Sequence, residues 1–151
     1  MSIKIGDNAP NFSLKDQNGN AVSLDSFLGK KVILFFYPKD DTPGCTVEAC
    51  NFRDDFEIYE EKNAVLLGIS KDGEESHRKF ISKFNLPFSL LCDEDHAVAE
   101  EYGAWGEKSM YGRKYMGIIR STIVVDTEGK VEQLFEKVKP KDHSKELLEL
   151  L

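Results

Sequence analysis

The sequence contains little that would hold the chain at a membrane or on a polyanion. No apolar run approaches the length of about 20 residues that a membrane-spanning helix requires, and the longest covers only residues 32–37. The N-terminal residues lack the apolar segment of a secretory signal. Basic residues are in the minority, because 20 Lys and Arg stand against 27 Asp and Glu, for a net charge of −7. The sequence therefore predicts a cytoplasmic protein that binds neither nucleic acid nor a membrane.

Cysteine is also scarce. The three cysteines, Cys45, Cys50 and Cys92, are an odd set, and cysteines of cytosolic proteins are usually reduced. A chain of 151 residues is long enough to bury a core without the help of disulfides or a metal. We expect one domain over residues 1–151, in which the cysteines are either buried and inert or redox-active.

The hydrophobic pattern predicts strands and helices in alternation. The continuous apolar runs 31–37 and 64–70 are typical of central strands covered on both faces, and Asn18-Gly19-Asn20 predicts the turn of an N-terminal hairpin. Helices are expected at 25–28, 45–62, 73–85, 97–102 and 141–151, further strands at 88–91, 118–125 and 131–135, and a glycine-rich loop at 105–117. This order predicts an α/β fold with helices on the faces of a central sheet.

Cys45 lies where a buried strand gives way to a helix. Thr42 is a good N-cap residue and Pro43 suits the first helical position, so Cys45 falls in the first turn. Free backbone N–H groups and the helix dipole favour a negative charge there, which supports a reactive thiolate. Position alone also fits a small buried hydrophobic residue that begins the apolar stripe of the helix.

Cys50 makes the redox interpretation more specific. Five residues of helix correspond to about 7.5 Å of rise and about 140° of rotation. A disulfide usually requires a Cα separation of about 4.4–6.8 Å, so an intact helix does not allow Cys45 and Cys50 to pair. If they do pair, the first turns of the helix must unwind. Otherwise Cys50 is an ordinary thiol on the helix.

Other side chains allow both a functional and a structural interpretation. Arg120, expected at the start of an apolar strand, requires a partner, which is either an anionic thiolate or solvent and an Asp. Glu48 is within reach of Cys45 on the helix and either assists proton transfer or is an ordinary surface residue. Cys92 is expected to be a core thiol, and Tyr111, Tyr115 and Met116 either pack in their loop or line a binding surface. His77, His96 and His143 are expected at the surface, because none has a partner at metal-ligand spacing.

Taken together, these residues resemble the peroxiredoxin family. The stretch from Phe36 to Thr46 is similar to the family signature Pro-x-x-x-Thr-x-x-Cys, and Cys50 five residues later is similar to the subgroup called bacterioferritin comigratory protein or peroxiredoxin Q. Trp105-Gly106-Glu107-Lys108 and Arg120-Ser121-Thr122 match that subgroup, and the resemblance spans nearly the whole chain.

The resemblance implies a fold, an activity and a set of roles. The fold is thioredoxin-like, with a central mixed sheet flanked by helices and an added N-terminal β-hairpin. The activity is the reduction of hydrogen peroxide and organic hydroperoxides by a monomer that a thioredoxin-type dithiol recycles, without a metal or organic cofactor. The implied roles are peroxidatic for Cys45, resolving for Cys50, hydrogen bonding to thiolate and peroxide for Thr42, charge stabilisation for Arg120, and shielding of the pocket for Pro38.

Two other functions are compatible with the composition. A thiol–disulfide oxidoreductase of the same fold usually has a Cys-x-x-Cys motif, whereas four residues separate Cys45 from Cys50 here. A binding or holdase protein with incidental cysteines would form no sulfenic acid at Cys45 when exposed to peroxide.

Overall fold

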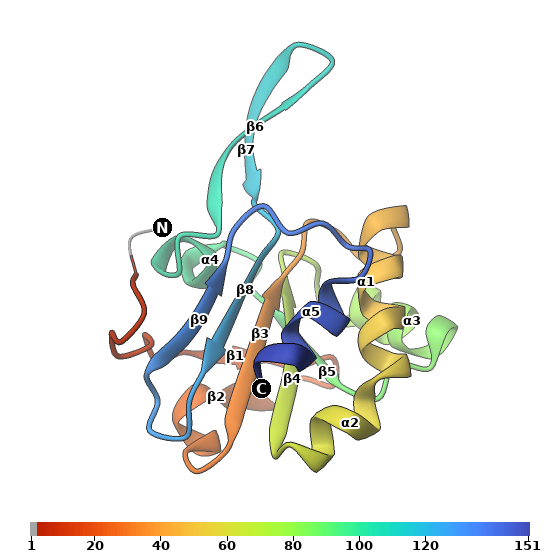
Figure 1. The fold of residues 1–151 in the computed structure, drawn as a ribbon. Helices are drawn as coiled ribbons and strands as arrows, with labels where there is room; N and C mark the ends of the chain where they lie inside the picture. Colours follow the sequence, from red (N-terminus) through yellow and green to blue (C-terminus); the bar gives the residue numbers. More distant parts are fainter. Residues whose placement is uncertain (1–2) are drawn as a thin grey trace.

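The computed structural model describes residues 3–151 and is built around a mixed sheet (Figure 1). Within these residues, seven strands form the sheet in the order β2-β1-β5-β4-β3-β8-β9. These strands are β1 (Ser13–Lys15), β2 (Ala21–Ser23), β3 (Lys31–Phe36), β4 (Ala64–Ser70), β5 (Ser89–Cys92), β8 (Ser121–Val125) and β9 (Val131–Phe135). Strands β3, β4 and β5 are parallel to one another, whereas β8, β9 and the β1–β2 hairpin pair in antiparallel fashion. The predicted α/β fold with an added N-terminal hairpin is confirmed.

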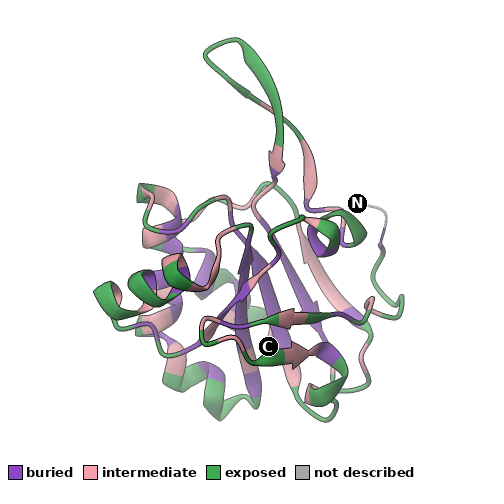
Figure 2. Cartoon of the chain, turned by 180° about the vertical axis from the view of Figure 1, so that it is seen from behind, coloured by how far each residue is buried: buried purple, intermediate pink, exposed green. Residues whose placement is uncertain are grey.

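The alternation of side chains along β3 divides the core into two layers. Ile33, Phe35 and Tyr37 point to the face that carries most of the helices, and Val32, Leu34 and Phe36 point to the other face. The helical elements are η1 (Leu24–Phe27), α1 (Pro43–Asp54), α2 (Phe56–Glu61), α3 (Glu74–Phe84), α4 (Ala97–Glu101) and α5 (His143–Leu150). Residues of α1, α2, α3 and α5 pack on the first face, and residues of η1 and α4 pack on the second. Both faces of the central strands are therefore buried (Figure 2), as their continuous apolar sequence predicts.

The helix expected over residues 45–62 is divided into α1 and α2. The helix ends at Asp54, and Asp55 has φ −97° and ψ 5°. The Asp55 carboxylate accepts hydrogen bonds from Ser144 Oγ (2.7 Å) and Lys145 Nζ (2.8 Å) at the start of α5. The break therefore coincides with a contact to a helix about 90 residues away, which local periodicity does not reveal.

The loop expected over residues 105–117 is instead a β-hairpin. Strands β6 (Trp105–Met110) and β7 (Arg113–Ile118) form a separate two-stranded antiparallel sheet that stands out from the body (Figure 1). Tyr111 and Gly112 occupy the turn with φ of 51° and 77°, the left-handed geometry that two-residue hairpins favour. Most of the hairpin is exposed or only partly buried, on both of its faces. Its sequence therefore lacks the alternation of apolar and polar residues that identifies a half-buried strand.

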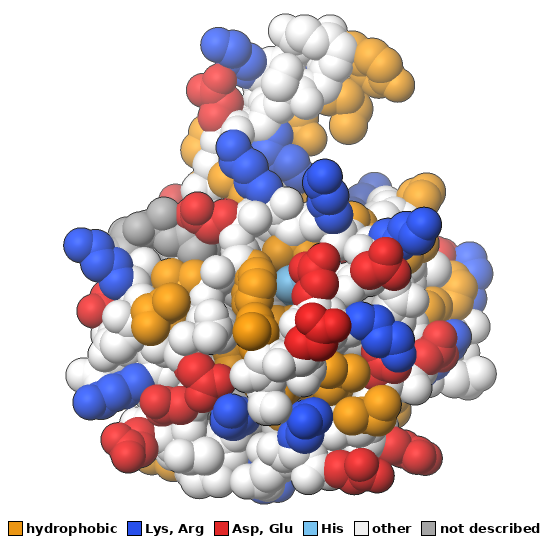
Figure 3. Space-filling model, viewed as in Figure 1, with side chains coloured by type: hydrophobic (Ala, Val, Ile, Leu, Met, Phe, Trp, Pro, Cys, Tyr) orange, Lys and Arg blue, Asp and Glu red, His pale blue; other side chains and the backbone are white. Residues whose placement is uncertain are grey.

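The same hairpin carries large hydrophobic side chains that are open to solvent. Met110, Tyr111, Tyr115 and Met116 are between 42% and 99% exposed, and hydrophobic side chains stand out on the hairpin in the space-filling view (Figure 3). On the rest of the face shown there, acidic and basic side chains are interspersed. Of the two interpretations of Tyr111, Tyr115 and Met116, packing within a loop is therefore wrong.

None of the helices formed by residues 3–151 has the length and apolar character needed to cross a membrane.

Candidate active site

Cys45 lies in the first turn of α1, at the C-terminal edge of the parallel strands. Thr42 precedes the helix in an extended conformation and Pro43 is the first helical residue, as predicted. Cys45 is only 2% exposed and packs in the core layer with Ala49 and Phe52. The sulfur is thus shielded from bulk water and close to the positive end of the helix dipole.

Arg120 connects the sulfur to a buried carboxyl group. Its Nη2 donates to Cys45 Sγ (3.3 Å), and its Nη1 donates to Glu48 Oε1 (3.0 Å). Arg120 does not begin a strand as expected, but lies between β7 and β8, where its carbonyl oxygen accepts a hydrogen bond from Val138 N. Both partners of the guanidinium come from one helix turn of α1, which explains how an Arg can be half-buried here.

The buried charges of the site influence one another. Burial raises the pKa of Glu48 to about 7, against the opposing effect of the Arg120 charge. Burial lowers the pKa of Arg120, but Glu48 and Cys45 outweigh it and raise the pKa above its usual value. Lys108 of β6 also interacts with this group, since burial and Arg120 lower the pKa of its amine and Cys45 opposes them. Lys108 Nζ donates to the Ile118 carbonyl oxygen (2.9 Å), which joins the base of the hairpin to the site.

Thr42 and Pro38 lie on the segment that leads into α1. The Thr42 hydroxyl donates to the Lys39 carbonyl oxygen (2.8 Å), which leaves the lone pairs of the hydroxyl oxygen able to accept hydrogen bonds. Pro38 directly follows the buried Tyr37 and is half-buried. Gly44 is confined between Arg120 and Pro140, because a Cβ at this position would lie 3.1 Å from Arg120 Nη2 and 3.3 Å from Pro140 Cγ. These contacts bring the segment before α5 to the same site.

Cys50 is a reduced, half-buried thiol in the middle of the intact helix α1. Burial raises its pKa, with Arg53 opposing and Asp54 adding to the shift, so the thiol form predominates at neutral pH. Cys92 ends β5, half-buried rather than fully in the core, and burial together with nearby carboxylates raises its pKa to about 11. Cys92 therefore has the character of an inert structural thiol.

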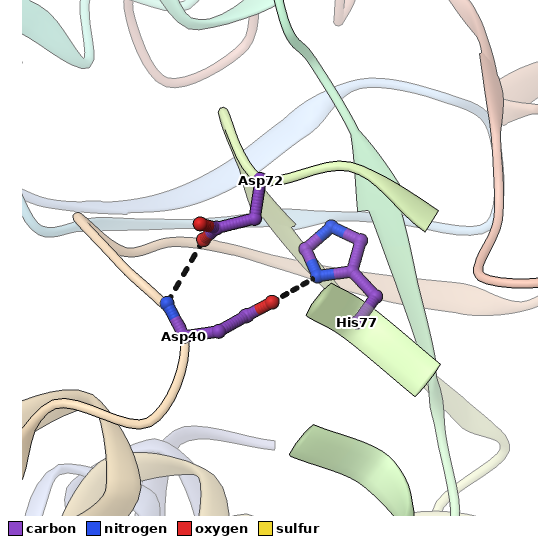
Figure 4. Close-up of side chains that lie close together, drawn as sticks. All are labelled: Asp40, Asp72 and His77. Atoms are coloured by element: carbon purple, nitrogen blue, oxygen red, sulfur yellow. Dashed lines mark hydrogen bonds and ion pairs between the residues drawn. The ribbon is translucent and has the colours of Figure 1, made fainter. Parts of the chain in front are cut away.

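The segment before Thr42 is held by a buried polar cluster made of Asp40, Asp72 and His77 (Figure 4). The Asp40 carboxylate binds His77 Nδ1 (2.7 Å) and accepts hydrogen bonds from the hydroxyls of Tyr37 and Ser76. The Asp40 backbone N–H donates to Asp72 Oδ2 (2.8 Å). Because His77 Nε2 faces the Leu91 carbonyl oxygen, an acceptor, Nε2 carries a proton. The atoms of these three side chains that could bind a metal ion are thus engaged in hydrogen bonds. The cluster holds the loop that positions Cys45 against α3 and β5.

The expectation of surface histidines is wrong for His77 and His143. His77 is fully buried and His143 is 2% exposed, with His143 Nε2 bonded to Thr122 Oγ1 (2.8 Å) and its ring against Phe52 and Phe135. The helical spacing contained the signal, since His77 precedes Phe80 by three residues and His143 precedes Leu147 by four, on the apolar faces. His96 is partly exposed and stacks on Trp105 with ring centroids 3.8 Å apart.

Three comparisons place the chain among known proteins. Residues 5–134 match the model of the AhpC/TSA family. Peroxiredoxin Bcp of Bacillus subtilis (strain 168) is 49% identical over 151 residues, covering 100% of this chain and 96% of that protein. Peroxiredoxin Bcp of Escherichia coli (strain K12) is 47% identical over 141 residues, covering 93% and 90%.

Solved structures give the same result. A cysteine-to-serine mutant of PrxQ from Xylella fastidiosa superimposes with a TM-score of 0.94 at 30% identity, covering 99% of this chain and 96% of that one. Bacterioferritin comigratory protein from Xanthomonas campestris, whose structures address its alkyl peroxide reduction activity, matches with a TM-score of 0.90 at 32% identity over 99% and 95%. The chain belongs to the AhpC/TSA family, within the group of Bcp and PrxQ peroxiredoxins.

Proposed function

We propose that Cys45 is the peroxidatic cysteine of this thiol peroxidase. The observation that carries the proposal is the hydrogen bond from Arg120 Nη2 to a buried sulfur in the first turn of a helix. A guanidinium and the helix N-terminus both favour the thiolate, and the thiolate is the nucleophilic form of cysteine. The same guanidinium is placed to stabilise the charge that develops on a peroxide oxygen.

The reaction with a hydroperoxide is a two-electron transfer to the O–O bond. The Cys45 sulfur attacks the terminal oxygen, an S–O bond forms and the O–O bond breaks. The leaving oxygen departs with the electron pair and becomes an alcohol, or water when the substrate is hydrogen peroxide. Cys45 is thereby oxidised to a sulfenic acid, the first step of cysteine oxidation.

Thr42 and Pro38 complete the proposed pocket. Because the Thr42 hydroxyl already donates its proton to the Lys39 carbonyl, its oxygen is available to accept a hydrogen bond from the O–H of an incoming hydroperoxide. Pro38 lacks a backbone N–H, has an apolar ring and lies half-buried on the segment between β3 and α1. We assign it the shielding of the thiolate from water.

Cys50 is proposed as the resolving cysteine. Its thiol condenses with the Cys45 sulfenic acid, a sulfur–sulfur bond forms and water leaves. Since α1 is continuous from Pro43 to Asp54, this step requires the first turns of the helix to unwind. The raised pKa of Cys50 within the helix supports the division of roles, because Cys50 stays protonated until Cys45 has been oxidised.

A dithiol reductant of the thioredoxin type returns both cysteines to thiols by disulfide exchange. We further propose that the chain acts as a single-domain monomer in the cytoplasm. Two arguments support this: the proposed pairing of Cys45 with Cys50 needs no second subunit, and recycling by a dithiol requires a reducing compartment. Size-exclusion chromatography with light scattering tests the monomer, and fractionation of cells tests the location.

The decisive experiment follows the peroxide through each cysteine. Wild type, Cys45→Ser, Cys50→Ser and the control Cys92→Ser are each treated with one equivalent of hydrogen peroxide, trapped with dimedone and digested for mass spectrometry. We expect a peptide joining Cys45 and Cys50 in wild type and in the Cys92 variant, a dimedone adduct at Cys45 in the Cys50 variant, and neither product in the Cys45 variant. Peroxide turnover by Cys45→Ser at the wild-type rate would refute the assignment.

A further inference from the structure

Glu48 is bonded to Arg120 in the site, but the peroxidase reaction as written gives it no role. It is 1% exposed, and its Oε1 accepts the hydrogen bond from Arg120 Nη1. Among residues 3–151, its other oxygen, Oε2, has no hydrogen-bond partner. A buried carboxyl group with one unpartnered oxygen is costly as an anion, and the cost is smaller when that oxygen carries a proton.

Arg120 is shared by two groups that can each be an anion. Its two terminal nitrogens bind Cys45 Sγ and Glu48 Oε1. One guanidinium balances one negative charge, and a second buried anion beside the first is strongly disfavoured. A thiolate at Cys45 therefore favours a neutral Glu48, and loss of the thiolate favours an ionised Glu48. Such a pair titrates as a unit rather than as two independent groups.

We propose that Glu48 holds the proton that the leaving oxygen needs, and that the negative charge of the site passes from Cys45 to Glu48 during sulfenic acid formation. This inference rests on the proposed role of Cys45. Before the reaction, Cys45 is a thiolate and Glu48 is a neutral acid, and afterwards Cys45 is a neutral sulfenic acid and Glu48 is a carboxylate. Arg120 pairs with the anion in both states.

The atoms and charges of this step balance within the site. The sulfur forms a bond to the terminal oxygen of the hydroperoxide, which keeps its hydrogen, and the O–O bond breaks. The leaving oxygen, held by Arg120, takes the Glu48 proton and departs as an alcohol or as water. The net charge of protein and substrate is the same before and after, so the step consumes no proton from solvent. Burial also holds the pKa of Glu48 at about 7, so the proton is present at neutral pH and is not held too strongly to be given up.

Other titratable groups near Cys45, Arg120 and Glu48 are not placed to donate this proton. Lys108 reaches the site from β6, but its amine donates to the Ile118 carbonyl oxygen, and among residues 3–151 no hydrogen bond joins it to Cys45 or Arg120. His143, at the start of α5, has a pKa lowered by burial and by Arg120, with Glu146 opposing them. Its Nε2 is bonded to Thr122 Oγ1, away from the sulfur. Glu48 is therefore the acid that shares a hydrogen-bonding partner with the reacting atom.

The test counts protons during a single turnover. Cys50→Ser protein, in which the sulfenic acid cannot be resolved, is compared with the double variant Cys50→Ser, Glu48→Gln. The amide side chain of the double variant keeps an oxygen that accepts the Arg120 hydrogen bond but holds no acidic proton. Each protein is mixed with one equivalent of hydrogen peroxide in weak buffer with a pH indicator, near pH 8, so that the carboxylate formed at Glu48 is not reprotonated from solvent. Proton uptake is divided by the dimedone adduct formed at Cys45.

Without Glu48, the leaving oxygen has to take its proton from solvent. We expect the protein with Glu48 to take up about zero protons per sulfenic acid formed, and the double variant to take up about one. Infrared difference spectra should show loss of the C=O stretch of a protonated carboxyl group only when Glu48 is present. Equal uptake in the two proteins, or uptake of about one proton when Glu48 is present, would overturn the inference. The latter result is decisive even if the double variant folds poorly, and circular dichroism checks its fold. Absence of the dimedone adduct from both proteins would instead refute the role of Cys45.

Discussion

The requirement that α1 unwinds before Cys45 and Cys50 pair can be tested at Val47. This residue lies between the two cysteines on α1, and its side chain is 44% exposed, so changes there alter helix stability with little effect on packing. Gly is less favourable than Ala in a helix interior by about 0.8–1.0 kcal/mol. If the helix is unwound when the disulfide forms, Val47→Gly lowers the cost of that state relative to Val47→Ala by the same amount.

This difference corresponds to disulfide formation about four- to fivefold faster in the Gly variant than in the Ala variant. The assay mixes each protein with one equivalent of peroxide, quenches with acid at increasing times and measures the Cys45–Cys50 peptide by mass spectrometry. The disappearance of the dimedone-reactive form gives the same rate independently. Sulfenic acid formation is expected to change little, because the folded helix predominates in both variants.

Ile58 provides the matched control. It is also a β-branched, 40% exposed helix residue, but it lies on α2, outside the segment that must unwind. Ile58→Ala and Ile58→Gly are expected to differ in global stability to urea as the Val47 pair does, with no difference in the rate of disulfide formation. The reasoning would be refuted if the two Val47 variants formed the disulfide at equal rates, or if the Ile58 pair showed the same ratio.

Three further predictions concern the charged groups of the site and its support. Arg120→Lys loses the paired hydrogen bonds to Cys45 and Glu48. Stopped-flow measurement should show that sulfenic acid formation is slowed about 10²–10³-fold, and a decrease in its rate of less than about threefold would contradict the role of the guanidinium. The pKa of Glu48 is raised on folding from 4.5 to about 7, so its contribution to stability is complete below pH 4.5 and is lost as the pH rises through 7. Urea unfolding should therefore show wild type losing on the order of 3 kcal/mol relative to Glu48→Gln between pH 4 and pH 8, and a pH-independent difference would contradict the shift. Asp40→Ala removes the carboxylate that binds His77 Nδ1 and accepts a hydrogen bond from the Tyr37 hydroxyl, and the loss of this partner for two buried polar groups should lower the free energy of unfolding by about 2–6 kcal/mol. A loss below about 1 kcal/mol in urea titration would exclude this role of Asp40.

Local sequence predicted most of the elements and the place of Cys45 in the first turn of a helix. Continuous apolar runs specify β3 and β4 as central strands, because both faces of these strands are covered. Thr42 and Pro43 predict where α1 begins, since the N-cap and first-turn preferences depend only on nearby residues. In the structure, however, the Thr42 side chain caps no helix N–H, and its hydroxyl donates to the Lys39 carbonyl oxygen. The five-residue separation of Cys45 and Cys50 determines, from helix geometry alone, that a disulfide between them is incompatible with the intact helix.

Contacts between distant segments decided what the sequence could not. The break at Asp55 depends on α5, the burial of His77 depends on Asp40 and Leu91, and the β6–β7 hairpin has no buried face that would produce a periodic pattern. Above all, Glu48 and Arg120 are 72 residues apart, and neither shows by itself whether it is a surface charge. Only the packing of α1 against the segment before β8 buries the carboxyl group, gives the guanidinium two partners and joins both to Cys45, because the stability of a buried charge depends on its neighbours in space.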